Sequence, residues 1–431
     1  MAPGTVPASA PVATGGSPPS RGLRWGLLAP LLLATLAYAR VLGGEFQFDD
    51  LTSVEENPAV KAPALLLARP LLDGSFRPLT DLGFALNHAL GRLDPLGYPV
   101  LNRARHLLAV VLVHRLSLAV LRRAGAARVQ GTALAVAGAF AVHPLHSQAV
   151  SYVAQRAEVL ASVLYLGALL LLLEADRRGR GVGGVAAWGG ALAVWLLGLH
   201  AKAVAVSLPA AWVLLAATLP RGEEPAPRRL GRALLQVAPF LALAALFAVR
   251  TVGSLRGRPD AGLEVPGIPP LAYALTQIRV VLGYLRLLAW PSGQNLDHEV
   301  APSTGLDGPT LLAAAALAAL LAAAVVLSVR SRAWPAPGRA AARLGLLGLG
   351  WFLLVLAPTS SAIPLADLME EHRAYLASWG PLLAAGAAAA RLLDRFAPAR
   401  RRMVAAVGVA ATWLGLALAL HARNAVWETK R

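Results

Sequence analysis

Residues 310–329 have the sequence TLLAAAALAALLAAAVVLSV, an apolar run that no charged residue interrupts. A helix of about 20 such residues is long enough to cross the roughly 30 Å of hydrocarbon in a bilayer. Comparable runs recur along the chain of 431 residues, which is 57% hydrophobic and only 15% charged. This composition predicts an all-α polytopic membrane protein and excludes an ordinary soluble fold.

These apolar runs predict a bundle of about 11 transmembrane helices. The expected spans lie near residues 25–42, 104–121, 129–142, 157–174, 183–199, 203–219, 231–249, 310–329, 343–357, 379–394 and 403–420. The segment 271–290 is also apolar, but it carries Gln277, Arg279 and Arg286. If that segment crossed the membrane, the basic loop 330–343 would lie on the wrong side, so we expect an interfacial or re-entrant helix there.

The formal net charge is +17, and the positive residues gather in alternate connections between the spans. These connections contain Arg122, Arg123, Arg128, Arg177, Arg178, Arg180, Arg221, Arg228, Arg229, Arg330, Arg332, Arg339, Arg395, Arg400, Arg401 and Arg402. The positive-inside rule predicts that they are cytoplasmic, with the N-terminus inside and the C-terminus outside. The basicity therefore predicts topology, and we infer no nucleic-acid partner from it. Since the chain has no cysteine, disulfides and thiolate chemistry are excluded.

The same topology divides the chain into three parts. Residues 1–22 form a predicted disordered cytoplasmic tail, residues 23–420 a transmembrane domain, and residues 421–431 an outer tail. Within the transmembrane domain, the first outer loop covers 43–103 and the second large outer loop covers 250–309. Ala37-Tyr38-Ala39 mimics a signal-peptide cleavage site, but the preceding apolar run is long for a signal peptide, so we expect a retained span.

Two motifs on the predicted outer face carry candidate chemistry. Asp49 and Asp50 lie just beyond the first span, where one carboxylate suits a general base and the other an orienting group or a metal ligand; a solvated acidic turn is the alternative. His143 and His146 precede Arg156, whose planar guanidinium suits a phosphate. The two His residues add donors to the same anion, and a zinc site is the weaker alternative because no H-E-x-x-H pattern occurs.

Further candidates lie in two later outer connections. Lys202 joins two spans with almost no loop, so its charge lies near the membrane boundary and needs an anionic partner or must snorkel. The segment from Glu370 to Tyr375 gathers several ionisable groups directly before a span, and interfacial anchoring is the alternative. Together these groups suit transfer of a sugar from an anionic lipid-linked donor. A transporter or lipid flippase and a non-catalytic membrane scaffold remain the other function classes, although no internal repeat is evident.

The order of several weak motifs resembles the transmembrane and tetratricopeptide-repeat containing O-mannosyltransferases and their bacterial relatives. The motifs are FxFDD at Phe46 to Asp50, RPLTxLxFxLNxxLG from Arg77, LDxxGYxxxN from Leu93, HPxHxxAVxYVxxRxExLA from His143, YLRLLxWP from Tyr284 and EHRxYL from Glu371. Where relatives begin their repeat array, the chain has Arg423 to Trp427, and we expect it to lack that array. Bacterial relatives imply an inner-membrane location.

The resemblance implies a GT-C type glycosyltransferase that uses a polyprenyl-phosphate sugar as lipid donor and a protein or glycan as acceptor. It implies an Asp of the first outer loop as catalytic base, which corresponds to Asp49 and Asp50. The donor phosphate contacts correspond to Arg156, Lys202, Arg373, His143, His146 and His372, with Arg77, Glu158, Glu371 and Tyr375 in supporting roles. No cofactor is expected with certainty, and a divalent metal stays open. Relatives commonly have S-K-E where this chain has Ala201-Lys202-Ala203, so one carboxylate is missing.

Overall fold

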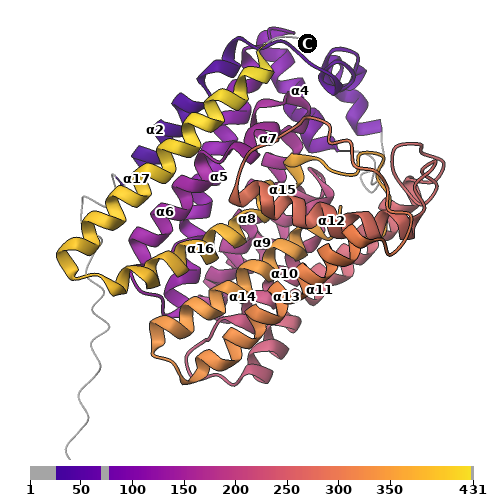
Figure 1. Cartoon of the computed structure of the whole chain (residues 1–431). Helices are drawn as coiled ribbons and strands as arrows, with labels where there is room; N and C mark the ends of the chain where they lie inside the picture. Colours follow the sequence, from indigo (N-terminus) through magenta and orange to yellow (C-terminus); the bar gives the residue numbers. More distant parts are fainter. Residues whose placement is uncertain (1–25, 69–76, 429–431) are drawn as a thin grey trace, which may run out of the picture.

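The computed structural model describes residues 26–68 and 77–428. The described part of the chain is a bundle of helices without a strand, and its one isolated bridge joins Ala261 to Leu365 (Figure 1). The predicted tail at 1–22 lies outside the described residues. The longer helices are α2 (Leu28–Ala37), α4 (Pro78–Gly91), α5 (Gly97–Ala124), α6 (Val129–Ala141), α8 (Arg156–Arg178), α9 (Val182–Leu199), α10 (Leu208–Thr218), α11 (Ala226–Ser254), α12 (Pro270–Ala289), α13 (Gly308–Arg330), α14 (Ala336–Leu356), α16 (Trp379–Leu392) and α17 (Pro398–Arg423). Short helices include α3 (Pro58–Lys61), α7 (Ser147–Ser151) and α15 (Ala374–Ala377).

Helices occur at all of the predicted spans, which confirms an all-α polytopic membrane protein. In the described residues, 8 helices are long and apolar enough to cross a membrane, and a bent pair makes up to 9. The bent pair joins Glu371–Ala377 to Trp379–Arg395 at an angle of 53°. Three expected spans are shorter apolar helices, at Leu28–Ala37, Val129–Ala141 and Ala203–Thr218. These shorter helices continue into 3₁₀ turns or loops that carry the polar motifs.

Helix α12 is the segment that we expected at the interface, and its length and composition would also let it span the membrane. The interfacial or re-entrant position of this helix stays a prediction. Near its start the Tyr273 hydroxyl donates to the carbonyl of Thr359, and near its end Tyr284 bonds the backbone of Glu370. Both partners belong to the connection between α14 and α15, which lies at one end of the bundle. The helix therefore follows that connection along its length.

Close packing between α14 and α16 shows how the core is built from small and aromatic side chains. A Cβ atom added to Gly348 would lie 2.4 Å from the carbonyl oxygen of Gly380, and one added to Gly380 would lie 2.3 Å from that of Gly348. One turn away, the rings of Trp351 and Trp379 meet edge to face at 4.6 Å. Small residues let two membrane helices approach closely enough for such packing to hold them together.

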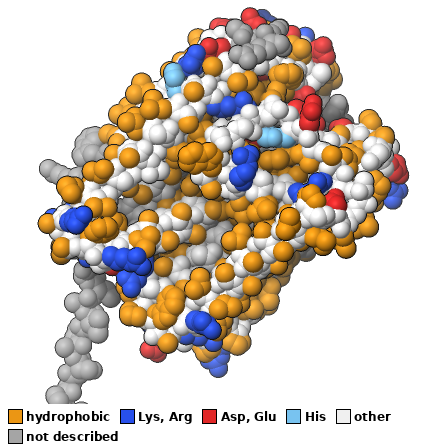
Figure 2. All heavy atoms as spheres, in the orientation of Figure 1, with side chains coloured by type: hydrophobic (Ala, Val, Ile, Leu, Met, Phe, Trp, Pro, Cys, Tyr) orange, Lys and Arg blue, Asp and Glu red, His pale blue; other side chains and the backbone are white. Residues whose placement is uncertain are grey.

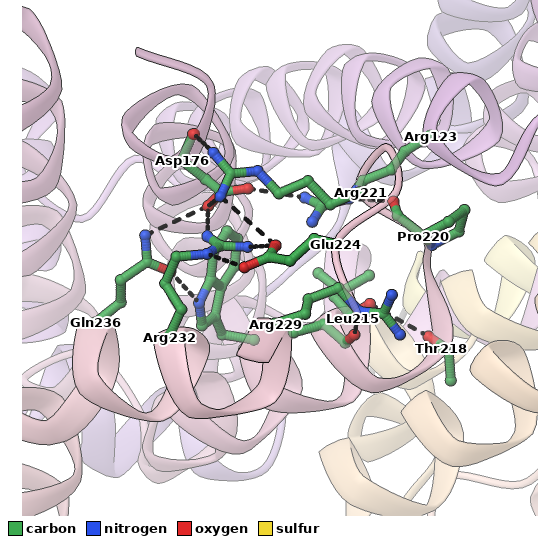
Figure 3. Close-up of polar contacts among 12 residues, drawn as sticks. Arg123, Asp176, Leu215, Thr218, Pro220, Arg221, Glu224, Arg229, Arg232 and Gln236 are labelled. Carbon is green, nitrogen blue, oxygen red and sulfur yellow. Dashed lines mark hydrogen bonds and ion pairs between the residues drawn. The ribbon is translucent and has the colours of Figure 1, made fainter. Parts of the chain in front are cut away.

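The two ends of the bundle differ in charge. Helix α8 begins with Arg156 and Glu158 and ends near Asp176, so these ends lie about 27 Å apart along the helix axis. Around Asp176 lie several of the basic connections, and we call this the basic end (Figure 3). At the opposite, acidic end lie Asp49, Glu158 and Glu370. On the face shown in Figure 2, apolar side chains cover the band between the two ends.

At the basic end, one buried carboxylate joins several helices (Figure 3). Asp176 is 4% exposed and pairs with Arg123 of α5 at 3.2 Å, with Arg221 of the α10–α11 connection at 3.4 Å, and with Arg232 of α11. Gln236 also donates to it at 3.4 Å. Basic residues from two predicted cytoplasmic connections, Arg123 and Arg221, thus meet at one place, in agreement with the prediction that they share a side.

We expect Asp176→Asn to lower the free energy of unfolding by roughly 3 kcal/mol, because it leaves the surrounding guanidinium groups without their buried anion. Thermal or detergent-induced unfolding of the purified chain measures this change. Asp394→Asn is the matched control, since Asp394 pairs with Arg128 and Arg391 but its side chain is 25% exposed. Exposed pairs contribute at most about 1 kcal/mol. Equal losses of unfolding free energy in the two variants would show that the Asp176 contacts stabilise the fold no more than the partly exposed contacts of Asp394.

Candidate active site

The turn from Phe46 to Asp50 exposes Phe48 and Asp49 and buries the residues on either side of them. Phe46 is buried and meets Tyr98 edge to face, with 5.0 Å between ring centroids. Phe48 is exposed and has a φ of 47°, in the left-handed region that non-glycine residues seldom adopt. Past this residue, Asp49 is exposed and Asp50 is 2% exposed. The two adjacent carboxylates therefore occupy different environments.

Asp50 fixes the turn against the start of α8. One carboxylate oxygen accepts the N–H of Gln47 at 3.1 Å and the other accepts the N–H of Ala154 at 2.6 Å. Burial raises the pKa of Asp50 to about 7, although its two N–H partners and the charge of Arg156 lower it. Both carboxylate oxygens are thus bound inside the protein, which is the arrangement of a positioning group.

Asp49 lies on the exposed side of the same turn, beside two aromatic rings. Its backbone N–H donates to the Tyr152 hydroxyl at 2.7 Å, and the Tyr152 ring stacks on Trp427 at 5.3 Å. The charge of Asp49 also acts on Asp367 and Glu370, and burial raises the pKa of both of these carboxyl groups. The first outer loop therefore faces the connection that precedes α15.

That connection presents Arg373 beside Glu370. The Arg373 guanidinium donates through Nη2 to the carbonyl of Asp367 at 2.8 Å and contacts the Glu370 carboxylate at 3.3 Å. Its other terminal nitrogen, Nη1, is buried without a hydrogen-bond partner among the described residues. Tyr273 and Tyr284 lie close enough for the Arg373 charge to affect their hydroxyl groups. One face of this cation thus remains available for a further acceptor.

Lys202 is the second cation of this region. Its ammonium lies 2.9 Å from the Glu158 carboxylate and 3.2 Å from the Gln155 side-chain oxygen. Burial lowers the pKa of Lys202, and the negative charges of Glu158 and Glu370 oppose this effect. Glu158 of α8 is therefore the ion-pair partner of Lys202. Exposed Arg77 lies within electrostatic range of the same groups.

We call the set formed by Asp49, Glu158, Lys202, Glu370 and Arg373 the outer polar cluster. Its members come from the first outer loop, α8, the α9–α10 connection and the segment before α15. Direct ion pairs join Lys202 to Glu158 and Arg373 to Glu370, and the charges of Glu370 and Asp49 link the rest. Residues more than 300 positions apart in the chain thus meet at the acidic end.

Arg156 lies beside this cluster in a different setting. Its side chain is 0% exposed, and its guanidinium carbon lies 4.1 Å from the Phe84 ring centroid and 5.4 Å from that of Tyr98. Nε donates to the Asn102 side chain at 3.2 Å, while Nη1 is buried without a partner in the described part of the chain. Aromatic faces stabilise this cation, but they do not neutralise it.

The predicted phosphate ligands His143 and His146 are buried, and their ring nitrogens have partners inside the bundle. His143 Nε2 bonds the carbonyl of Leu288 at 3.0 Å, and His146 Nε2 bonds the Ser378 hydroxyl at 2.9 Å. Burial lowers the pKa of His143 to about 4, so that ring is neutral near pH 7. Tyr375 is likewise buried, and its hydroxyl meets His106 at 2.7 Å. These side chains hold helices together, and we do not include them in the proposed phosphate site.

Glu371 and His372 connect the site to neighbouring segments. Glu371 accepts hydrogen bonds from the Gln294 side chain at 2.9 Å, the Asn295 backbone at 2.8 Å and His298 at 3.0 Å, so it fastens the second outer loop. The backbone N–H and ring Nδ1 of His372 both contact the Gln148 side-chain oxygen. Both residues therefore position the segment that carries Arg373.

The residues expected to form an outer tail at 421–431 are packed as far as Trp427. Asn424 is buried and accepts hydrogen bonds from the hydroxyls of Ser147 at 2.7 Å and Ser151 at 3.0 Å. Trp427 donates to Ser147 at 2.8 Å. Because Trp427 stacks on Tyr152, this C-terminal segment supports the aromatic wall beside Asp49. No motif of the sequence indicates this contact.

Sequence reasoning left a metal ligand role open for the acidic residues. Among residues 26–68 and 77–428, no group of three or more His, Asp or Glu side chains is arranged to hold a metal ion. The ligand set for a divalent metal is therefore not assigned.

Sequence comparisons show similarity to protein O-mannosyl-transferases, although no family model and no solved structure matches the chain. It is 34% identical over 164 residues to a protein O-mannosyl-transferase of Caenorhabditis elegans, which covers 35% of this chain and 23% of that protein. It is 37% identical over 172 residues to protein O-mannosyl-transferase TMTC1 of Mus musculus. This match covers 35% of this chain and 18% of that protein. It is 34% identical over 150 residues to protein O-mannosyl-transferase TMTC3 of Homo sapiens. This match covers 32% of this chain and 16% of that protein. The matches thus span less than a quarter of these relatives' own length.

Proposed function

The chain is a relative of the TMTC protein O-mannosyl-transferases over about a third of its length, and from this premise we propose that it is a membrane glycosyltransferase of the GT-C type. It transfers a sugar from a polyprenyl-phosphate-linked donor to a hydroxyl of a protein or glycan acceptor. The observation that carries the proposal is the outer polar cluster, in which the charge of exposed Asp49 acts on Glu370, the ion-pair partner of buried Arg373, at one end of the bundle.

We assign the general base to Asp49 and a positioning role to Asp50. The Asp49 carboxylate is exposed to an incoming acceptor, whereas both Asp50 oxygens accept backbone N–H groups. As the acceptor oxygen forms its bond to the anomeric carbon, the hydroxyl proton passes to Asp49. The bond from that carbon to the phosphate oxygen breaks, and the polyprenyl phosphate leaves with the electron pair. This single displacement inverts the anomeric centre.

The leaving phosphate needs positive charge, and the cluster supplies it. Arg373 has an unpartnered buried nitrogen, and Lys202 is a buried ammonium held by Glu158. Arg156 adds a third cation beside Asp50. Preorganised cations in a site shielded from water stabilise charge that develops in the transition state. Arg77 and Glu158 support this arrangement, and the face that carries it is the predicted outer face of the membrane.

The proposal is tested with the full chain in lipid nanodiscs, a polyprenyl-phosphate mannose and an acceptor protein. Transfer of mannose to acceptor hydroxyls, with release of polyprenyl phosphate in equal amount, is the expected result. A flippase is the competing function, and proteoliposomes test it with the same donor. Movement of the donor across the vesicle membrane without sugar transfer to any offered acceptor would contradict the proposal.

The ionisation of Asp50 predicts a pH dependence. Since its pKa is raised to about 7, transfer is expected to rise as pH passes upward through about 7, because only the carboxylate accepts both N–H groups that hold the turn. Asp50→Asn is expected to be slower and to lack this rise. The fold favours the neutral carboxyl, so stability from this group is present below its ordinary pKa and lost as pH rises through about 7.

Activity and the stability contribution of Asp50 are thus expected to change in opposite directions with pH, which distinguishes an effect on catalysis from an effect on folding. Between pH 7 and pH 5 the thermal midpoint should not fall on account of Asp50, even though the transfer rate falls. A rate that drops together with the thermal midpoint, or an unchanged profile in Asp50→Asn, would remove Asp50 from the pH dependence.

A further inference from the structure

A further group of unpartnered donors lies under α4 beside the outer polar cluster, and Arg156 belongs to this group. The nitrogens Nη1 of Arg105, Nη1 of Arg156 and Nδ2 of Asn102 are each buried without a hydrogen-bond partner in the described residues. Arg156 is 0% exposed, and its Nε already donates to the Asn102 oxygen at 3.2 Å. All three unmatched atoms are donors, so the ligand that would satisfy them must present several acceptors.

The two arginines lie within electrostatic range of each other, and neither forms a direct ion pair in the described part of the chain. Burying two like charges side by side is unfavourable unless an anion joins them. Lys202 and Arg373 differ in this respect, because Glu158 and Glu370 pair with them.

Gly83 of α4 makes room for this pair. A Cβ atom at Gly83 would lie 2.9 Å from Arg105 Nη2 and 3.7 Å from Arg156 Nη1. The missing side chain thus leaves both guanidinium groups beneath one point of the α4 backbone. Helix α4 packs against α5, which carries Arg105, and against α8, which begins with Arg156.

The outer surface of α4 indicates which kind of anion fits. Leu82, Leu86 and Leu90 are spaced by four residues on one helical face and are 51%, 52% and 80% exposed. An amphipathic helix with such a stripe lies at a membrane interface, where acyl or prenyl chains contact the apolar face. A phosphate beneath α4 would therefore be close to lipid chains on the same helix.

We propose that Arg105, together with Arg156 and Asn102, binds the phosphate of a polyprenyl monophosphate under Gly83, with the lipid chain along the leucine stripe of α4. Arg105 is thereby a phosphate-binding residue that no motif of the sequence indicated. The inference rests on the proposed function, since it assigns a binding site to the phosphate of the lipid-linked donor and of its lipid product. The phosphate is held by charge-assisted hydrogen bonds from two guanidinium groups.

Binding of two probes to the purified full chain tests this site. Titration with a short polyprenyl monophosphate and, separately, with inorganic phosphate is followed by the thermal midpoint. Arg105→Gln should weaken the lipid probe roughly tenfold to a hundredfold, since it removes a charge-assisted hydrogen bond. Arg105→Lys should retain part of the affinity. Arg115→Gln is the matched control, because Arg115 is exposed on the same helix.

A second variant keeps the test independent of the arginine itself. Gly83→Ala would displace only the tip of Arg105, and it should weaken the lipid probe while leaving the thermal midpoint without ligand unchanged. Equal affinity of wild type, Arg105→Gln and Gly83→Ala would overturn the proposal. Equal protection by inorganic phosphate and by the lipid probe would overturn the part that assigns a lipid.

The two proposals can fail separately. In one outcome the wild type transfers sugar, and Arg105→Gln binds the lipid probe and transfers sugar equally well. In that case the proposed phosphate-binding site is wrong and the transferase function stands. If the wild type transfers no sugar, yet binding of the lipid probe depends on Arg105 and Gly83, the phosphate-binding site is supported and the transferase function is wrong.

Discussion

Replacing Asp49 by Asn is expected to lower the rate of sugar transfer about a thousandfold, because a positioned general base contributes roughly 10²–10⁴-fold. The Asn side chain keeps the size of Asp49 but cannot accept the proton of the acceptor hydroxyl. The measurement is release of polyprenyl phosphate by the variant at saturating donor and acceptor, so that the loss falls on kcat. Since Asp49 is exposed, folding should be unaffected.

Two comparisons make this result specific. Glu56→Gln changes another exposed carboxylate of the first outer loop and should retain wild-type activity. Asp50→Asn should also lose activity, but with a change in thermal stability, because it disturbs the hydrogen bonds to Gln47 and Ala154. Near wild-type transfer by Asp49→Asn together with an inactive, stable Asp50→Asn would reverse the two roles.

Replacing Arg373 by Ala should lower kcat about a hundredfold to a thousandfold, in line with the loss of one group that stabilises developing charge. The side chain is buried, it pairs with Glu370 at 3.3 Å, and its Nη1 is unpartnered in the described structure. If its role is to stabilise the leaving phosphate, donors with a more acidic leaving group should lose less. A purely structural role would slow all donors equally.

The control for this variant is Arg286→Ala, which removes an exposed arginine of α12. It should leave kcat unchanged. Arg373→Lys should recover only part of the rate, because an ammonium cannot reproduce the two-sided contact of a guanidinium with both Glu370 and a phosphate. Full recovery by Lys would show that charge alone, without the fork geometry, is sufficient.

The lengths of the apolar segments in the sequence predicted most of the helices of the fold. The run at 310–329 became α13 at Gly308–Arg330, and the basic residues Arg123 and Arg221 meet at one end as their alternation indicated. Hydropathy reports whether a segment can lie in lipid, so it finds helices well. It does not report how a helix lies relative to the bilayer, so it does not distinguish a spanning α12 from an interfacial one.

The candidate site was predictable in composition but not in geometry. Sequence alone gave no reason to separate Asp49 from Asp50, because burial of Asp50 depends on its contact with Ala154, which lies 104 positions away in the chain. The His motif suggested an anion site, whereas His143 and His146 bond Leu288 and Ser378 within the bundle. Tertiary packing decides such roles, and it is not encoded in local spacing.

Arg105 was also missed, although a signal existed. It falls inside the apolar run expected at 104–121, and an ionisable residue within a span is a candidate for function. The pairing with Arg156 joins two helices, so it becomes visible only when α5 and α8 are side by side.

The contact between the first and last helices has a consequence for biosynthesis. Helix α2 packs against α17, Asn424 donates to the carbonyl of Ala37 at 3.1 Å, and Trp427 stacks on Tyr152 beside Asp49. A ribosome delivers α2 and the Asp49 turn well before α17. During translation the nascent chain must hold α2 in the bilayer without its partner, and the aromatic stack beside Asp49 forms only when α17 and the segment after it are in place.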